Sequence, residues 1–158
     1  MAVQNSTSKV QYTLTGSGQT LSVPFYFLED AHLKVINTDA DGVDTTLVLD
    51  SSNGYTVTGA GVESGGSIVL GATVGVSGET ITIKRDIPVT QLVDYVYNDA
   101  FPSETHEQAL DKLTMICQLL LEIQNRSLQY PESEAGGVGN ILPDLNDRKG
   151  NFLRFNST

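Results

Sequence analysis

The sequence is poor in the residues on which protein chemistry most often depends. It has one cysteine, two histidines and no tryptophan among its 158 residues. The single Cys117 excludes an intrachain disulfide, and with His32 and His106 far apart it makes a zinc site implausible. Cys117 follows Met115 and Ile116 in an apolar run, so we expect a buried, reduced thiol. Such a thiol fits folding in a reducing cytoplasm.

Basic residues and long hydrophobic runs are also scarce. Nine Lys and Arg residues stand against nineteen Asp and Glu residues, which gives a net charge of −10. This charge repels nucleic-acid phosphates and anionic lipids, so we predict that the chain binds neither. No apolar stretch approaches the roughly 20 residues that a membrane span needs. Residues 1–20 are too polar for a signal peptide.

Enzyme motifs are missing as well. No G-x-S-x-G, C-x-x-C or H-E-x-x-H motif is present. Residues 39–44 have some features of a calcium loop, but the loop's glutamate and flanking helices are lacking, so a hairpin turn is the expected structure. We therefore predict a protein without enzymatic activity and without a metal or cofactor.

What the sequence does contain is a period-two alternation of polar and apolar residues, which predicts β-strands. About seven short strands are expected, over residues 9–14, 21–27, 32–37, 45–49, 55–58, 67–70 and 80–87. Asp41-Gly42 and Asn53-Gly54 supply the positive φ that hairpin turns demand. Pro24 lacks a backbone donor, so its strand should be bulged or at a sheet edge. We predict a mainly β fold, a small antiparallel sandwich or barrel over residues 1–102.

The pattern changes after Pro102. No Gly or Pro interrupts residues 103–130, which we predict to form one long helix. Ser103 is the expected N-cap, and Thr105 with Gln108 offers an alternative capping box. Residues 131–158 hold three glycines between 132 and 139 and should form a mobile tether with a terminal docking segment.

The apolar residues of the helix recur in alternating steps of four and three, broken only by Ser127. This spacing is typical of a coiled coil, written as a heptad a to g with apolar a and d positions. Leu113 and Leu120 take the a position. The combination of Leu at a and Ile at d disfavours two strands and favours three or four. The interface residues would be Ala109, Leu113, Ile116, Leu120, Ile123 and Tyr130.

Further apolar residues flank this strip, including Leu110, Cys117, Leu119 and Leu121. We expect one side of the helix to meet sister helices and another side to meet the β domain. The alternative is a helix packed wholly on its own β domain.

Two segments are rich in residues that suit protein interfaces. The first lies between the last strand and the helix, where we expect partner contacts from Asp94, Tyr95, Tyr97, Asn98 and Phe101, together with His106. These aromatic residues could equally fix the helix to the β domain. The second is the C-terminus, where Phe152, Leu153 and Phe155 form either a docking peptide or a frayed tail.

Several blocks of the sequence resemble the N-terminal tail-attachment domain of podovirus tail fibres. The blocks are residues 11–20, 22–29, 55–61, 80–86, 90–95 and 101–113, and the resemblance covers about residues 9–125. It implies a trimer that sits where the portal-bound adaptor meets the nozzle of a short phage tail, with a helical stem leading to a shaft. The expected location is the virion, after assembly in the cytoplasm of the host.

The chain departs from that family pattern at its C-terminus, because a receptor-binding tip is missing. We expect a stub that carries a separate fibre or spike protein through Phe152, Leu153 and Phe155; a reduced fibre is the alternative. A trimeric surface adhesin fragment is a second reading, against which the lack of an export signal counts. A hydrolase has no candidate site in the sequence.

Overall fold

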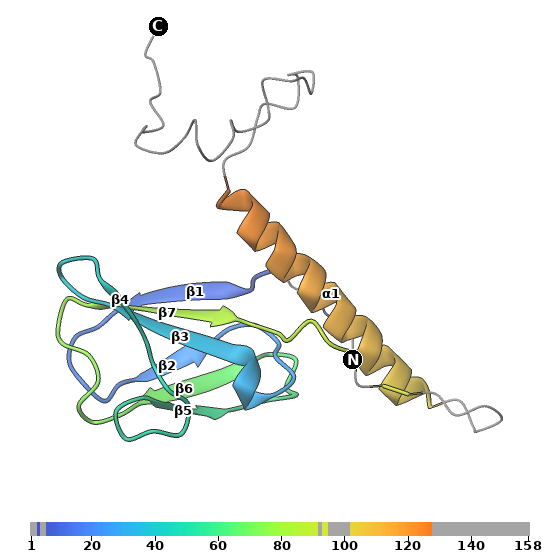
Figure 1. The fold of residues 1–158 in the computed structure, drawn as a ribbon. Helices are drawn as coiled ribbons and strands as arrows, with labels where there is room; N and C mark the ends of the chain where they lie inside the picture. The colour runs from blue at the N-terminus through green and yellow to red at the C-terminus, as the bar shows by residue number, and fades with distance from the viewer. Residues whose placement is uncertain (1–2, 4–5, 92, 95–101, 128–158) are drawn as a thin grey trace, which may run out of the picture. The chain divides into compact units, whose positions relative to one another are not determined.

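The computed structural model describes residues 3, 6–91, 93–94 and 102–127. These residues form seven strands, a 3-10 turn at Asp30–His32 and one helix (Figure 1). The strands are β1 Lys9–Thr13, β2 Thr20–Val23, β3 Leu33–Thr38, β4 Asp44–Thr46, β5 Tyr55–Thr58, β6 Gly66–Leu70 and β7 Thr80–Arg85. The helix α1, Ser103–Asn125, follows all of them. The predicted mainly β fold with a C-terminal helix is confirmed.

The strands form two antiparallel sheets. One has four strands in the order β1-β7-β3-β4, and the other has three in the order β2-β6-β5. In the first sheet β7 lies between β1 and β3, pairing Ile83 with Val10 on one side and with Val35 on the other. Consecutive strands therefore often belong to different sheets, as in a sandwich.

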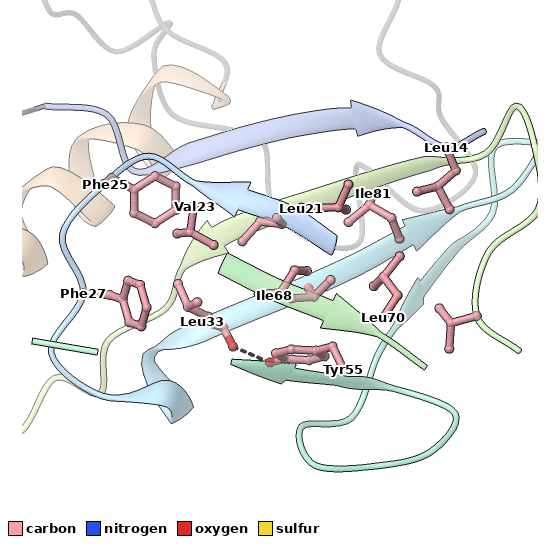
Figure 2. Close-up of a cluster of buried hydrophobic side chains, with 13 residues drawn as sticks. Leu14, Leu21, Val23, Phe25, Phe27, Leu33, Tyr55, Ile68, Leu70 and Ile81 are labelled. Atoms are coloured by element: carbon pink, nitrogen blue, oxygen red, sulfur yellow. Dashed lines mark hydrogen bonds between the residues drawn. The ribbon is translucent and has the colours of Figure 1, made fainter. Parts of the chain in front are cut away.

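A single apolar core fills the space between the sheets, as Figure 2 shows. Val23 and Ile68 come from the three-stranded sheet and Val35, Ile81 and Ile83 from the four-stranded sheet, all of them fully buried. These residues are the inward half of the alternation seen in the sequence.

A buried hydrogen bond joins the two sheets through the core. The Tyr55 hydroxyl of β5 donates to the backbone carbonyl of Leu33 at 2.7 Å (Figure 2). The bond satisfies a polar group that burial would otherwise leave unpaired.

Local signals account for most of the strand ends. β2 is an edge strand and ends at Val23, directly before Pro24, as the missing donor of proline predicts. β3 and β4 form the expected hairpin, in which Asp39 Oδ1 accepts from the Val43 amide at 2.8 Å and Gly42 has a φ of +81°.

The prediction of a hairpin at Asn53-Gly54 is wrong. β4 and β5 lie in different sheets, so the chain crosses between layers there. The positive φ in this crossing belongs to Asp50.

The helix begins at Ser103, one residue earlier than the capping signals predict. Pro102 is the N-cap in an extended conformation, and no side chain caps the helix. Ser103 is therefore the first helical residue, and both predicted caps are wrong. The Pro102 carbonyl accepts the His106 amide at 3.0 Å and so starts the helical ladder. The predicted stretch up to Tyr130 runs past Ser127 into residues outside the described part of the chain.

Candidate oligomerisation surface

One face of α1 is docked on the sandwich. Met115 and Leu119 are buried, and Met115 belongs to a second apolar cluster with Tyr26 and Ile87. Ile116 packs at the margin of this cluster. Burial of such side chains contributes about 1.5–3 kcal/mol each, which holds the helix to its own β domain.

Arg85, the last residue of β7, joins the sandwich to the helix. Its side chain is 1% exposed and donates to the Tyr26 carbonyl at 3.1 Å, the Thr7 carbonyl at 3.1 Å and Gln118 Oε1 at 2.9 Å. The guanidinium also lies over the Phe25 ring at 5.6 Å. Burial lowers the pKa of Arg85 to about 10, so the group keeps its positive charge at neutral pH.

Asp111 is the second charged residue at this junction. It is buried on the docked face, and its Oδ1 accepts the Val3 amide at 3.1 Å. Desolvation raises the pKa of Asp111, the charges of Glu107 and Glu63 raise it further, and the bond from Val3 opposes the rise. The helix is therefore fixed at Met115 by apolar contacts and at its flanks by two buried charged groups.

Most of the docked residues occupy the side of the helix that faces outward in a coiled coil, and Leu119 lies on the flank beside the seam. In the heptad assigned above, Met115 is at c, Asp111 and Gln118 are at f, and Leu119 is at g. The a/d strip lies roughly 120° around the helix from them, at about 100° per residue. The sandwich therefore leaves Leu113, Leu120 and Ile123 of the a/d strip exposed, whereas Ala109 and Ile116 are half-buried.

Exposed apolar side chains gather on that uncovered side. Eleven large apolar side chains are exposed among the described residues, and five of them, 45–57% exposed, lie on α1. They are Leu110, Leu113, Leu120, Leu121 and Ile123. Of the predicted interface residues, Ala109 and Ile116 are half-buried and Tyr130 lies outside the described part. An apolar strip of this kind on a soluble domain marks an interaction surface.

The prediction of a buried Cys117 is wrong. Its thiol is exposed in the single chain, because its e position on α1 points away from the docked face. The apolar neighbours in the sequence are on other sides of the helix, so the run Met115-Ile116-Cys117 does not share one environment.

A groove of about 380 Å³ opens over the first half of the strip. Its floor includes Ala109, Leu113 and Ile116 of α1, and one wall is the segment that carries Val89 and Thr90. The Lys112 ammonium donates to the Thr90 carbonyl at 2.7 Å and ties this wall to the helix.

The structure brings together only some of the predicted partner-binding residues. His106 is half-buried and lines the groove, whereas Asp94 is exposed and does not line it. Tyr95, Tyr97, Asn98 and Phe101, like Phe152, Leu153 and Phe155, lie outside the described residues.

Sequence reasoning missed Arg85 and Asp111. Both are charged residues that pattern reading places at the surface. A signal for Asp111 was nonetheless present, because it lies four residues before Met115 and eight before Leu119, on one helix face. For Arg85 no such signal exists, since its partners come from Thr7, Tyr26 and Gln118.

No metal-binding cluster of three His, Cys, Asp or Glu side chains occurs among the residues that the structure describes. In the same residues, no helix combines the length and apolar character of a membrane span.

The sequence is similar to part of a known protein. No family model matches the chain. Over 138 residues, 84% of its length, the chain is 37% identical to the tail spike protein of Salmonella phage epsilon15. The chain is similar to a phage tail protein.

The matched region is a small part of the phage protein. The chain spans 13% of the length of this tail spike protein. A match to 84% of the 158 residues leaves about 25 residues unmatched, so a continuous match includes β3 to β7 and α1 wherever it begins.

Proposed function

We propose that the chain is a homotrimeric, non-enzymatic tail-fibre or fibre-adaptor protein of a short phage tail. It is anchored where the adaptor meets the nozzle, and its three α1 helices pair along the a/d strip. The likeness to a phage tail spike protein supports the virion setting. It favours this reading over a surface adhesin fragment.

The observation that carries the proposal is the exposure of the strip in a helix that is otherwise docked. Leu113 and Leu120 are 57% and 56% exposed, while Met115 and Leu119 on another face are buried. A helix that packs only on its own sandwich needs one apolar face, whereas α1 has a second apolar face that is exposed. Covering the strip with sister helices contributes about 1 kcal/mol or more for each half-exposed leucine.

The packing geometry supports three copies. Leu113 and Leu120 at a, with Ile116 and Ile123 at d, favour assemblies of more than two helices. The sandwich contacts α1 mainly at the outward c and f positions, through Met115 and Gln118, and leaves Leu113, Leu120 and Ile123 of the seam exposed, so three sandwiches can surround three helices.

Light scattering on the full chain tests this proposal. The wild type should have three times the 17.0 kDa mass of one chain. The double variant Leu113→Asp/Leu120→Asp should have the mass of one chain, because buried carboxylates at a positions are costly. The matched control Val48→Asp, at an exposed valine outside the helix, should stay trimeric. A wild type that is monomeric at high concentration would overturn the proposal.

The C-terminal docking role is part of the same proposal. Phe152, Leu153 and Phe155 would carry a separate fibre or spike protein. Deleting residues 146–158 should remove that protein from assembled particles while the deleted chain itself is still incorporated. Particles that keep every other tail protein after the deletion would contradict the docking role.

A further inference from the structure

Two exposed residues on α1 have no role in an a/d seam. Leu110 is 51% exposed and Cys117 is also exposed, and both occupy e positions beside the strip. Neither contributes to the apolar cluster that docks the helix on its own sandwich. Leu110 and Cys117 together form a flank whose exposure is explained neither by the seam nor by the contact with the sandwich.

One wall of the groove lies on the opposite flank of the a/d strip, the g side, and is also exposed. Val89 lines the groove and is 72% exposed, and Gln91 follows it along the wall. The bond from Lys112, a g residue, to the Thr90 carbonyl fixes the wall against the g side. The groove floor is the a/d strip itself, through Ala109, Leu113 and Ile116.

Coiled-coil geometry brings these two flanks together between copies. In parallel coiled coils the g flank of one helix faces the e flank of the next. The g residue Lys112 lies opposite the e residue of the following heptad, which is Cys117 of the neighbouring copy. The wall at Val89 to Gln91 stands beside Lys112, so it faces the same flank.

We propose that the wall formed by Val89, Thr90 and Gln91 in each copy packs against the flank of Leu110 and Cys117 in the next copy. The groove is then half of a site that a second copy completes, and the β domain contacts the helix of its neighbour as well as its own. This inference rests on the proposed trimer and names a contact that the a/d seam does not require.

The charge distribution favours a second copy as the occupant. Each chain has a net charge of −10, so copies repel one another over most of their surface. Between residues 109 and 121 the charged residues are Asp111, which is buried against its own sandwich, and Lys112. A second copy can therefore approach this region without bringing acidic side chains together.

Cross-linking through the native thiol tests the contact. The variant Val89→Cys has two thiols per chain, at positions 89 and 117, because the sequence has no other cysteine. A short bismaleimide should then join copies in a closed ring of 89-to-117 links. The expected product on a denaturing gel is a covalent trimer at three times 17.0 kDa.

Two controls make this result specific. The wild type, or Val89→Cys/Cys117→Ser, has one thiol per chain and can form covalent dimers at most. Val48→Cys keeps Cys117 and adds a thiol at another exposed valine, so it should give no covalent trimer.

Light scattering of the same samples separates the two levels of the hypothesis. A trimer in solution without a covalent trimer in Val89→Cys overturns the flank contact and leaves the proposed function standing. A monomer in solution overturns the proposed trimer, and the flank contact with it. A covalent trimer from Val48→Cys as well would show that the linker is unselective and would also overturn the assigned contact.

Discussion

At the scale of single residues, the junction between sandwich and helix contains two buried charged groups without a buried partner of opposite charge. Arg85 donates to two carbonyls and the Gln118 amide oxygen while its Nε has no partner among the described residues, and Asp111 accepts from the Val3 amide. Burying a charge in this way costs stability but fixes geometry, since few other arrangements satisfy the same donors and acceptors. Both groups therefore help to set how the helix meets the sandwich.

Replacing Asp111→Asn should raise the free energy of unfolding at pH 7 by an amount on the order of 1 kcal/mol. Asparagine keeps an oxygen for the Val3 amide and removes the buried charge. The pKa of Asp111 is raised in the folded protein, so the folded state holds the proton more tightly and stability falls as pH rises above about 3.8.

The difference between the variant and the wild type should accordingly shrink as the pH is lowered toward 4. Urea unfolding at pH 4, 5 and 7 measures it. A variant less stable than the wild type at pH 7 would contradict this prediction.

His32 should make the fold sensitive to mild acid. It is buried, and its Nδ1 has no hydrogen-bond partner among the described residues. Desolvation lowers the pKa of His32, Lys112 lowers it further, and Glu29 opposes the shift. The unfolded chain therefore takes up the proton first, and stability is lost as the pH falls below about 6.5.

We expect His32→Leu to lose less unfolding free energy than the wild type between pH 7 and pH 5. Thermal unfolding at both pH values checks this. Equal losses in the two proteins would show that His32 does not titrate in that range.

At the scale of elements, the docking of α1 depends on a small number of side chains. Met115 is fully buried, so Met115→Ala should cost about 2–5 kcal/mol at this contact. Because the sandwich core lies elsewhere, the loss should appear as faster amide exchange in the helix and leave β7 protected. Gln108→Ala, an exposed position on the same helix, is the matched control. Equal protection of α1 in both variants would show that Met115 does not hold the helix.

The same scale shows what the sequence could and could not predict. Six of the seven strands follow from period-two alternation, because each has one face in the core between the sheets. The exception is β4, which is exposed along its whole length and follows from the turn at Asp41-Gly42 that pairs it with β3. Pro24 correctly marked an edge strand. Asn53-Gly54 misled because turn residues also serve crossings between sheets, and Ser103 misled because Pro102 starts the helix without a side-chain cap.

The candidate surface was predictable where it depends on periodicity along one helix. Of the predicted a/d residues, Leu113, Leu120 and Ile123 are exposed, Ala109 and Ile116 are half-buried, and Tyr130 lies outside the described residues. Contacts between segments distant in sequence were not predictable. Arg85 donates hydrogen bonds to Thr7 and Gln118, which are 78 and 33 positions away, and no local sequence pattern predicts such contacts.

At the scale of the whole molecule, charge should oppose assembly while the apolar strip drives it. Three chains of −10 bring together a total of −30. Added salt screens this repulsion, with a Debye length of about 8 Å at physiological ionic strength.

We therefore expect the concentration at which the trimer dissociates to fall as NaCl rises from low to physiological levels. Sedimentation at a series of salt concentrations measures this, and Leu113→Asp/Leu120→Asp should remain monomeric throughout. Dissociation that is promoted by salt would point to ion pairs as the main contacts between copies.

The helix joins the β domain through a small set of contacts: the apolar side chains of Met115, Leu119 and Ile116, and the hydrogen bonds of Arg85, Asp111 and Lys112. We expect this small contact to permit small changes in the angle between helix and sandwich as long as the buried hydrogen bonds of Arg85 and Asp111 are kept. In the proposed trimer, each of the three sandwich domains could then take a slightly different angle to its helix. A trimer could thereby bind a partner whose rotational symmetry is not threefold.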